Sequence, residues 1–142
     1  MLALDSNERT HSSHTDHKDD VAALTFSDDG QFLLSASADC TARVWRIRSG
    51  GSAAVCSTLL HEEPVSCITC SANARPNEPS NVATSCGDGR LRIWKVPIDK
   101  FAVNAGPPSR FSSPKIFKCH DSAIWSCAFN PKHDDQITTA SS

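Results

Sequence analysis

The chain of 142 residues repeats one pattern, and this repeat limits the possible folds more than any other feature. The first copy runs from His17 to Trp45 and holds three short apolar runs separated by turn residues. The second copy runs from His61 to Trp94, and a third begins at His120. Because units of this kind stack on their neighbours, the repeat predicts a series of similar layers rather than a single irregular core.

Within each unit, short stretches rich in Val, Ile, Phe, Thr and Trp are bounded by turn residues, which is the pattern of β-strands. We expect strands at 21–26, 32–37, 42–47 and 53–60, at 65–70, 82–86, 91–96 and 115–118, and at 124–129 and 136–140. A turn is expected between residues 130 and 135. Four short antiparallel strands in about 45 residues are typical of one blade of a β-propeller. The predicted fold class is therefore all-β, with about two and a half blades.

This pattern divides the chain into four segments. A flexible polar arm occupies residues 1–16, and the first unit occupies 17–60. The second unit covers 61–119 and contains a proline-rich loop at 97–114, where prolines exclude central strands. Residues 120–142 form the incomplete third unit.

From residue 17 onward the chain resembles the WD-repeat β-propeller family. The resemblance implies that each blade is held by a buried network of a His before the first strand, a Ser or Thr of the second strand, an Asp of the tight turn and a Trp of the third strand. It assigns these roles to His17, Ser37, Asp39 and Trp45, to His61, Cys86, Asp88 and Trp94, and, in the third unit, to His120 and Ser141. In both complete units the Asp lies six residues before the Trp and the Ser or Cys eight before it.

The chemistry of such a network follows from the groups themselves. A carboxylate can orient the imidazole, and a hydroxyl can link the imidazole to the indole N–H, which is only a donor. Cys86 offers a weaker thiol, so we expect the second network to be the weaker one. The family's Trp-Asp dipeptide is replaced by Trp45-Arg46 and Trp94-Lys95.

Some residues also have spacings that are found in metal sites or catalytic sites. Cys67 and Cys70 have the spacing of zinc ligands, but residues three apart on a strand point to opposite faces, so buried thiols are expected instead. The histidines at 11, 14 and 17 are expected in a solvated loop. His120-Asp121-Ser122 is contiguous, whereas a catalytic triad draws its groups from separated positions. We expect no metal, no cofactor and no enzymatic activity.

The charge of the chain bears on its partners and compartment. A net charge of −2 argues against binding to nucleic acid, and no apolar run is long enough to span a membrane. The polar N-terminus lacks the pattern of a signal peptide, and the seven cysteines are expected as free thiols. These features favour the cytoplasm, the nucleus or both.

The expected function is a non-catalytic protein–protein interaction scaffold that assembles multiprotein complexes. Two and a half blades cannot close a ring, so the chain is expected to be a fragment of a larger propeller. Its edges would need missing blades or self-association to cover them. The spacing predicts Asp at position 143 and Trp at position 149 of a longer chain.

Two residues are candidates for contact with a protein partner, and both leave alternatives open. Trp125 is either an exposed anchor or a packing residue for the next blade. Arg48 fits the Trp-Asp-x-Arg pattern of substrate receptors of cullin–RING ubiquitin ligases, although Arg46 breaks that pattern. The alternatives to a general scaffold are therefore such a receptor, or a subunit of an RNA-processing or trafficking complex.

Overall fold

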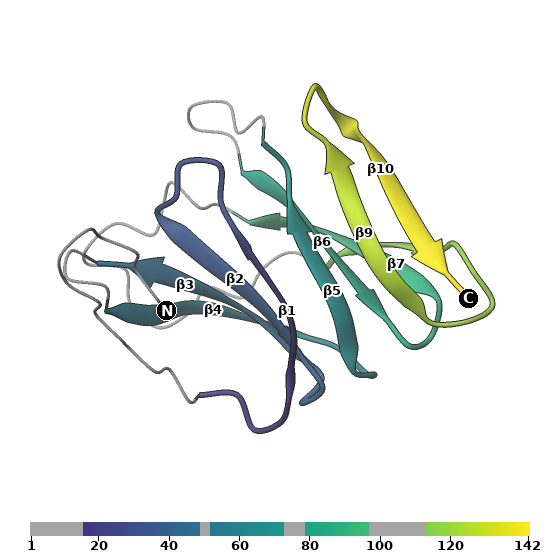
Figure 1. Cartoon of the computed structure of the whole chain (residues 1–142), viewed down its shortest axis with the longest axis horizontal. Coiled ribbons are helices and arrows are strands. Elements are labelled where there is room, and N and C mark those ends of the chain that lie inside the picture. The colour runs from purple at the N-terminus through teal and green to yellow at the C-terminus, as the bar shows by residue number, and fades with distance from the viewer. Residues whose placement is uncertain (1–15, 49–51, 73–78, 97–112) are drawn as a thin grey trace, which may run out of the picture.

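The computed structural model describes residues 16–48, 52–72, 79–96 and 113–142, which contain β-strands and no helix. The strands form two four-stranded sheets and one two-stranded sheet, all antiparallel (Figure 1). The first sheet consists of β1 (Val21–Phe26), β2 (Phe32–Ser37), β3 (Thr41–Ile47) and β4 (Ala53–Leu60). The second consists of β5 (Val65–Cys70), β6 (Ser80–Cys86), β7 (Arg90–Val96) and β8 (Lys115–Lys118). The third consists of β9 (Ile124–Asn130) and β10 (His133–Ser141).

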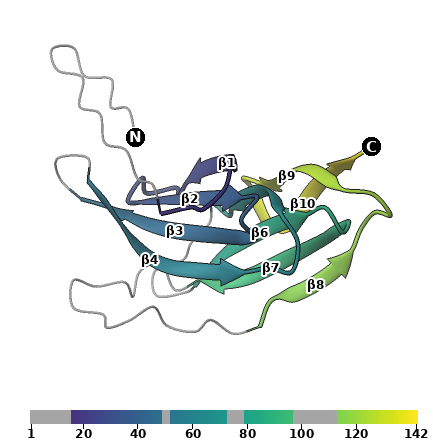
Figure 2. The same ribbon diagram turned by 90° about the horizontal axis from the view of Figure 1, so that it is seen from below.

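The three sheets follow one another in chain order and present their faces to each other. Figure 2 shows this stack from below, with β9 and β10 at the opposite end from β3 and β4. Along β2, Phe32, Leu34 and Ala36 are buried against the second sheet, whereas the residues between them point to the other side of the sheet. Burying a Leu or Phe side chain in this way contributes about 1.5–3 kcal/mol.

A separate apolar cluster joins the second sheet to β9 and β10. Ala83 and Leu91 of the second sheet pack there against Ile124 and Cys127 of β9. Within the described residues, the second sheet thus packs against both of the other sheets, whereas the first and third sheets each pack against one. This arrangement confirms the predicted all-β fold of partial propeller blades.

The strands lie close to their predicted positions, with one clear difference. β10 begins at His133, three residues before the expected start, so the predicted turn at 130–135 is shorter. The side chain of Asn130 closes this turn, because it accepts the Lys132 N–H at 3.0 Å and donates to Gln136 at 2.8 Å. The expected arm at 1–16 and the loop at 97–114 lie almost wholly outside the described residues.

Each sheet carries a β-bulge in its first strand, at the same place in the repeat. The pairing skips Ala22 between β1 and β2, Ser66 between β5 and β6, and Trp125 between β9 and β10. The side chain of Ser66 donates a hydrogen bond to the carbonyl of Ile124 in the next sheet. Since a bulge places two successive side chains on one face, this position faces the following unit.

The tight turn after the second strand connects each sheet to the next histidine. The carbonyl of Cys40 accepts the N–H of His61 at 3.0 Å, and the carbonyl of Gly89 accepts that of His120 at 3.2 Å. Both turn residues have positive φ, 63° at Cys40 and 70° at Gly89. A Cβ atom at Gly89 would lie 2.2 Å from the carbonyl oxygen of His120, so only glycine fits there.

Candidate functional site

The first histidine network consists of His17, Ser35, Asp39, Thr41 and Trp45. The Nδ1 atom of His17 lies 2.9 Å from an Asp39 carboxylate oxygen, and its Nε2 atom lies 2.6 Å from the Ser35 hydroxyl. The indole N–H of Trp45 donates to the same hydroxyl at 2.8 Å. These contacts join the segment before β1, the end of β3, the centre of β2 and the turn between β2 and β3.

The direction of the hydrogen bonds follows from the groups that can only donate or only accept. The Asp39 carboxylate only accepts, so Nδ1–H of His17 donates to it. The Ser35 hydroxyl accepts from the indole and keeps its own proton for Nε2 of a neutral imidazole. Burial would raise the pKa of Asp39, but hydrogen bonds from the Thr41 hydroxyl, the Lys18 N–H and His17 outweigh it and hold this pKa below its usual range.

The predicted member Ser37 is wrong, because the hydroxyl that bridges His17 and Trp45 belongs to Ser35. Trp45 pairs with Leu33 across the sheet, so Ser35 is its diagonal neighbour and Ser37 lies two residues farther away. Ser37 is fully buried, and its hydroxyl donates to the carbonyl of Asp19 at 3.2 Å and accepts the Asp39 N–H at 3.1 Å. Its contacts therefore hold the turn.

The second histidine network consists of His61, Thr84 and Trp94. The Thr84 hydroxyl lies 2.7 Å from Nε2 of His61 and accepts the indole N–H of Trp94 at 2.8 Å. The predicted member Cys86 is wrong for the same reason as Ser37, since Trp94 pairs with Val82 and Thr84 is its diagonal neighbour. Cys86 is buried in the cluster between the first two sheets.

Asp88 does not complete the second network as predicted. Nδ1 of His61 lies 3.1 Å from the carbonyl oxygen of Leu59, while Asp88 accepts a hydrogen bond from Arg92 at 2.8 Å. The side chains of Arg92 and Asp88 are 6% and 15% exposed, so this is a largely buried ion pair. Arg90 also contacts Asp88, at 3.5 Å and at the surface.

These neighbours set the protonation of His61. Burial is the largest cause that lowers the pKa of His61, to about 4, and the positive charge of Arg92 adds to it. The Leu59 carbonyl and the charge of Asp88 act in the opposite direction. The imidazole of His61 is therefore neutral at pH 7, as a hydrogen bond accepted from Thr84 requires.

The third unit contains the beginning of a similar network. Nε2 of His120 lies 2.9 Å from the hydroxyl of Thr139 on β10. The predicted member Ser141 is wrong, because its hydroxyl donates to the carbonyl of Ala123 at 2.8 Å. Thr139 and Ser141 thus repeat the division of roles between Ser35 and Ser37.

Sequence reasoning thus missed three hydroxyl groups, those of Ser35, Thr84 and Thr139. Each of them lies two residues before the predicted position. The signal that could have found them is the diagonal pairing between the second and third strands, which places the residue ten before the Trp next to its indole.

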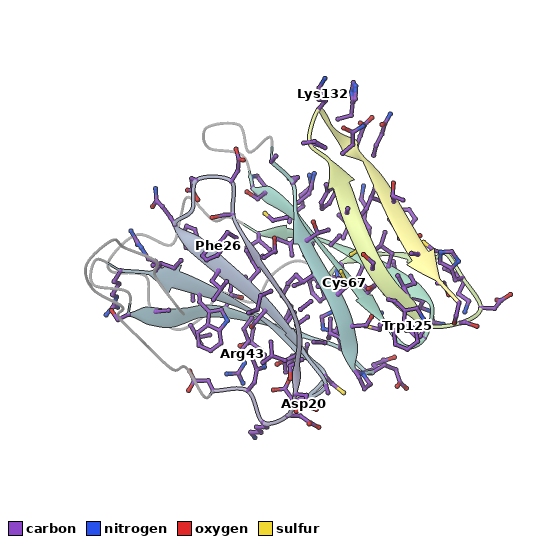
Figure 3. All side chains as sticks on the ribbon, in the orientation of Figure 1. Asp20, Phe26, Arg43, Cys67, Trp125 and Lys132 are labelled. Carbon is purple, nitrogen blue, oxygen red and sulfur yellow. The ribbon has the colours of Figure 1, made fainter. Side chains whose placement is uncertain are left out.

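The two ends of the stack carry exposed apolar side chains. On the outer face of the first sheet, Val21, Leu24 and Phe26 of β1 are 48%, 61% and 52% exposed. At the other end Trp125 is 63% exposed, at the bulge of β9 (Figure 3). The equivalent residue of the second sheet, Ser66, contacts the following sheet, so Trp125 lies where a further layer would pack. Arg48 is exposed directly after β3.

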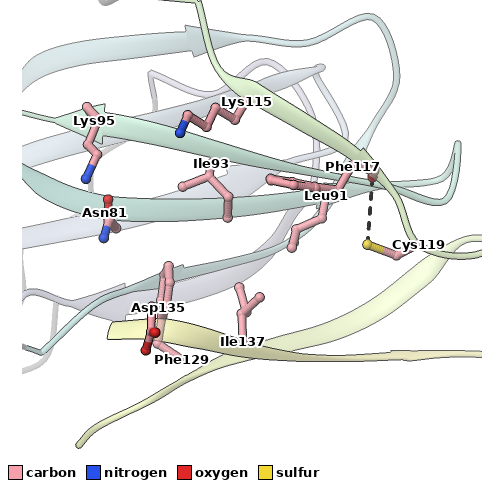
Figure 4. Close-up of a pocket in the computed structure, with 10 residues that line it drawn as sticks. All are labelled: Asn81, Leu91, Ile93, Lys95, Lys115, Phe117, Cys119, Phe129, Asp135 and Ile137. Carbon is pink, nitrogen blue, oxygen red and sulfur yellow. Dashed lines mark hydrogen bonds between the residues drawn. The ribbon is translucent and has the colours of Figure 1, made fainter. Parts of the chain in front are cut away.

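A pocket of about 390 Å³ lies between the second sheet and β9 and β10 (Figure 4). Leu91, Ile93 and Phe117 line it on one side, and Phe129 and Ile137 on the other. The charged side chains of Lys95, Lys115 and Asp135 also border it. The lining is mainly apolar, and no group of metal ligands lies among its described residues.

The described part of the chain contains no group of three or more His, Cys, Asp or Glu side chains placed to hold a metal ion. None of its described segments is a helix that could cross a membrane. The side chains of His120, Asp121 and Ser122 form no relay: His120 bonds to Thr139, and Asp121 lies at the surface 3.9 Å from Lys118.

Comparison with known proteins agrees with this geometry. A family model described as WD domain, G-beta repeat matches residues 8–46, 54–95 and 111–142. A WD repeat-containing protein WDS homolog from Arabidopsis thaliana is 33% identical over 82 residues, which cover 56% of this chain and 14% of that protein.

Two mouse proteins align with a larger share of the chain. Striatin-4 is 28% identical over 126 residues, and apoptotic protease-activating factor 1 is 26% identical over 124 residues. The matches cover 81% and 87% of this chain but only 16% and 8% of those proteins. The chain therefore spans less than a sixth of the length of each of these relatives.

Proposed function

This chain belongs to the WD-repeat family, and from that premise we propose that it is a non-catalytic scaffold for protein–protein interaction. The family is generally non-catalytic, and its members generally bind other proteins. We further propose that the chain works as part of a larger propeller that assembles multiprotein complexes in the cytoplasm or the nucleus.

The observation that carries this proposal is the contrast between a rigid interior and open ends. Buried hydrogen bonds fix His17 and His61 within their sheets, and turn carbonyls hold each sheet to the next. The outer faces nevertheless expose Leu24, Phe26 and Trp125. Exposed apolar side chains on a rigid framework favour contact with other protein surfaces.

The proposal is tested by sedimentation and by capture of binding proteins. The purified chain should sediment as a species larger than the monomer, or retain specific proteins from a cell extract. Trp125→Ser and Leu24→Ser should weaken both effects. Ile116→Ser is the matched control, because Ile116 is 55% exposed on β8, away from both ends. A stable, well-dispersed monomer that retains no protein would refute the proposal.

The alternative of a ubiquitin-ligase substrate receptor depends on Arg48. A receptor of that class should retain a ligase adaptor, and Arg48→Ala should release it. Absence of such an adaptor from both the wild-type and the variant captures would discard this alternative while leaving the general scaffold intact.

A further inference from the structure

Two cysteines from different units face each other across the boundary between the second and third sheets. Cys67 lies on β5 (Figure 3) and Cys127 on β9, 60 residues later, and their sulfur atoms are 3.4 Å apart. Cys127 is 7% exposed, whereas Cys67 is half-buried and retains contact with solvent. All seven cysteines are free thiols in this structure.

The contacts between the two residues favour a charge on Cys67. The thiol of Cys127 donates a hydrogen bond to the sulfur of Cys67, and the Cys127 N–H lies 3.3 Å from the same atom. The thiol hydrogen bond is the largest cause that lowers the pKa of Cys67, and it outweighs the opposing effect of burial. The same bond, followed by burial, raises the pKa of Cys127. The more accessible sulfur is thus also the better nucleophile.

The remaining cysteines have different surroundings. Cys70, on the same strand as Cys67, packs on the opposite face against the first sheet, and burial raises its pKa to about 11. Burial likewise raises the pKa of Cys86, to about 12. Cys119 is exposed, and its thiol donates to the Phe117 carbonyl at 3.7 Å. Across the described residues, no other two cysteines share a hydrogen bond.

We propose that Cys67 and Cys127 form an oxidative modification site, at which a hydroperoxide converts the two facing thiols into a disulfide between the second and third sheets. To form the bond, the two sulfur atoms must move from 3.4 Å apart to about 2.0 Å. Rotation of both side chains about their Cα–Cβ bonds can contribute to this approach.

The reaction balances with hydrogen peroxide as the oxidant. The thiolate of Cys67 attacks one peroxide oxygen, the O–O bond breaks, and the products are a sulfenic acid on Cys67 and hydroxide, which takes up a proton to form water. The sulfur of Cys127 then attacks the Cys67 sulfur, forms the S–S bond and releases the second oxygen as water. The two sulfurs lose two electrons, and the peroxide gains them.

A bond at this place would fasten the third sheet to the second. β9 and β10 make a sheet of two strands, held to the second sheet by the small apolar cluster around Leu91 and Ile124 and by hydrogen bonds such as that from Ser66 to the Ile124 carbonyl. A covalent link between β5 and β9 would oppose the separation of these layers. It would also reduce the number of conformations open to the unfolded chain, since it closes a long loop.

The test exposes the folded, reduced full-length chain to hydrogen peroxide, alkylates the remaining thiols and maps the cysteines by tandem mass spectrometry. The expected main product lacks the mass of two hydrogen atoms and joins Cys67 to Cys127. Fragment ions must separate Cys67 from Cys70, because both lie on β5. The oxidised chain should also unfold at a higher urea concentration than the reduced chain, and reduction should reverse the shift.

Variants and a denatured control complete the design. Cys67→Ser and Cys127→Ser should abolish the product, whereas the matched variant Cys70→Ser should keep it. Oxidation in concentrated urea should give mixed pairings, which shows that the fold selects the pair. The proposal is overturned if the folded wild-type chain forms other pairs preferentially, or if Cys67 is oxidised further while Cys127 remains a thiol. The disulfide pairs are identified in the wild-type protein, so this test does not depend on the folding of any variant.

Discussion

The first and second histidine networks share one chain of hydrogen bonds and differ in how they use an aspartate. In both, an indole N–H donates to a hydroxyl that lies within 2.7 Å of a histidine Nε2. In the first, Asp39 accepts from His17. In the second, Asp88 pairs with Arg92, and the histidine contacts a backbone carbonyl instead.

The side chains around each aspartate account for this difference. Thr41 donates to Asp39 at 2.6 Å and lies 3.3 Å from Nδ1 of His17, so it holds the carboxylate against the imidazole. Its counterpart Arg90 approaches Asp88 from the surface, and Arg92 approaches the same carboxylate from the buried side. Two arginines draw the carboxylate toward them, since charge-assisted hydrogen bonds are stronger than neutral ones. The aspartate position is thus shared by both units, whereas its role depends on its neighbours.

The largest effect is expected from Asp88→Ala, which should lower the free energy of unfolding by about 3–5 kcal/mol, because the buried guanidinium of Arg92 then has no partner. Urea denaturation followed by tryptophan fluorescence measures this. The double variant with Arg92→Met should regain part of the loss, and Arg90→Met should change little. Equal losses in the single and double variants would contradict the ion pair.

A pH titration of the unfolding free energy distinguishes the two networks. Between pH 6.5 and 4, His61 of the second network should change this free energy by as much as about 3 kcal/mol. The folded pKa of His61 is about 4, below the value near 6.5 of an unfolded histidine, so the unfolded chain binds more protons between these values. The contribution of neutral His61 is complete above pH 6.5 and is lost as the pH falls through 4. His61→Gln should flatten the unfolding free energy over this range.

Asp39 acts in a lower window. Because its folded pKa is depressed, its contribution is present above the ordinary carboxyl pKa and is lost only at more acidic pH. Asp39→Asn should therefore leave the change between pH 6.5 and 4 in place. If His61→Gln and wild type showed the same slope there, the assignment of that slope to His61 would be incorrect.

A smaller effect separates Ser35 from Ser37. Ser35→Ala should lower the unfolding free energy by about 2 kcal/mol, because it leaves His17 and the indole of Trp45 without a buried partner. Ser37→Ala should cost about 1 kcal/mol, since it removes contacts of the turn. The same urea measurement compares the two variants, and a larger loss for Ser37→Ala would reverse our assignment.

The smallest effect concerns the two tight turns. Cys40 has φ of 63°, a conformation that costs a residue with a Cβ atom about 1 kcal/mol, whereas the equivalent Gly89 has no such cost. Cys40→Gly should relieve this cost and raise the unfolding free energy. The gain should stay below about 1 kcal/mol, because glycine loses more conformational freedom on folding and this offsets part of it. A thermal unfolding curve shifted downward would argue against strain at this turn.

Much of the fold could be predicted from the sequence, because the same kinds of side chain recur at equivalent positions of each unit. Short runs of strand-forming residues, bounded by turn residues and recurring with the repeat, placed β1, β2, β4 and β8 at their observed bounds. β10 was misplaced at its start because the polar run His133–Gln136 looks like a turn, yet the Asn130 side chain closes a shorter one. Strand and turn propensities alone do not predict that hydrogen bond.

The networks were predicted less completely, since their members depend on register and on neighbours. Both Ser35 and Ser37 are hydroxyl residues on one face of β2, and only the pairing of Leu33 with Trp45 decides between them. Asp88 could pair with His61 or with Arg92, and the spacing of these residues along the chain does not decide between them. Cys67 and Cys127 meet only because two units stack, so no pattern within one unit reveals them.

Exchange of the two indole protons with solvent, followed by NMR, tests the central claim about these networks most directly. The indole N–H groups of Trp45 and Trp94 are donated to Ser35 and Thr84, so both should exchange slowly in the wild-type chain. Ser35→Ala should accelerate exchange at Trp45 and spare Trp94, and Ser37→Ala should leave both slow. Fast exchange of Trp45 in Ser37→Ala with slow exchange in Ser35→Ala would contradict the account.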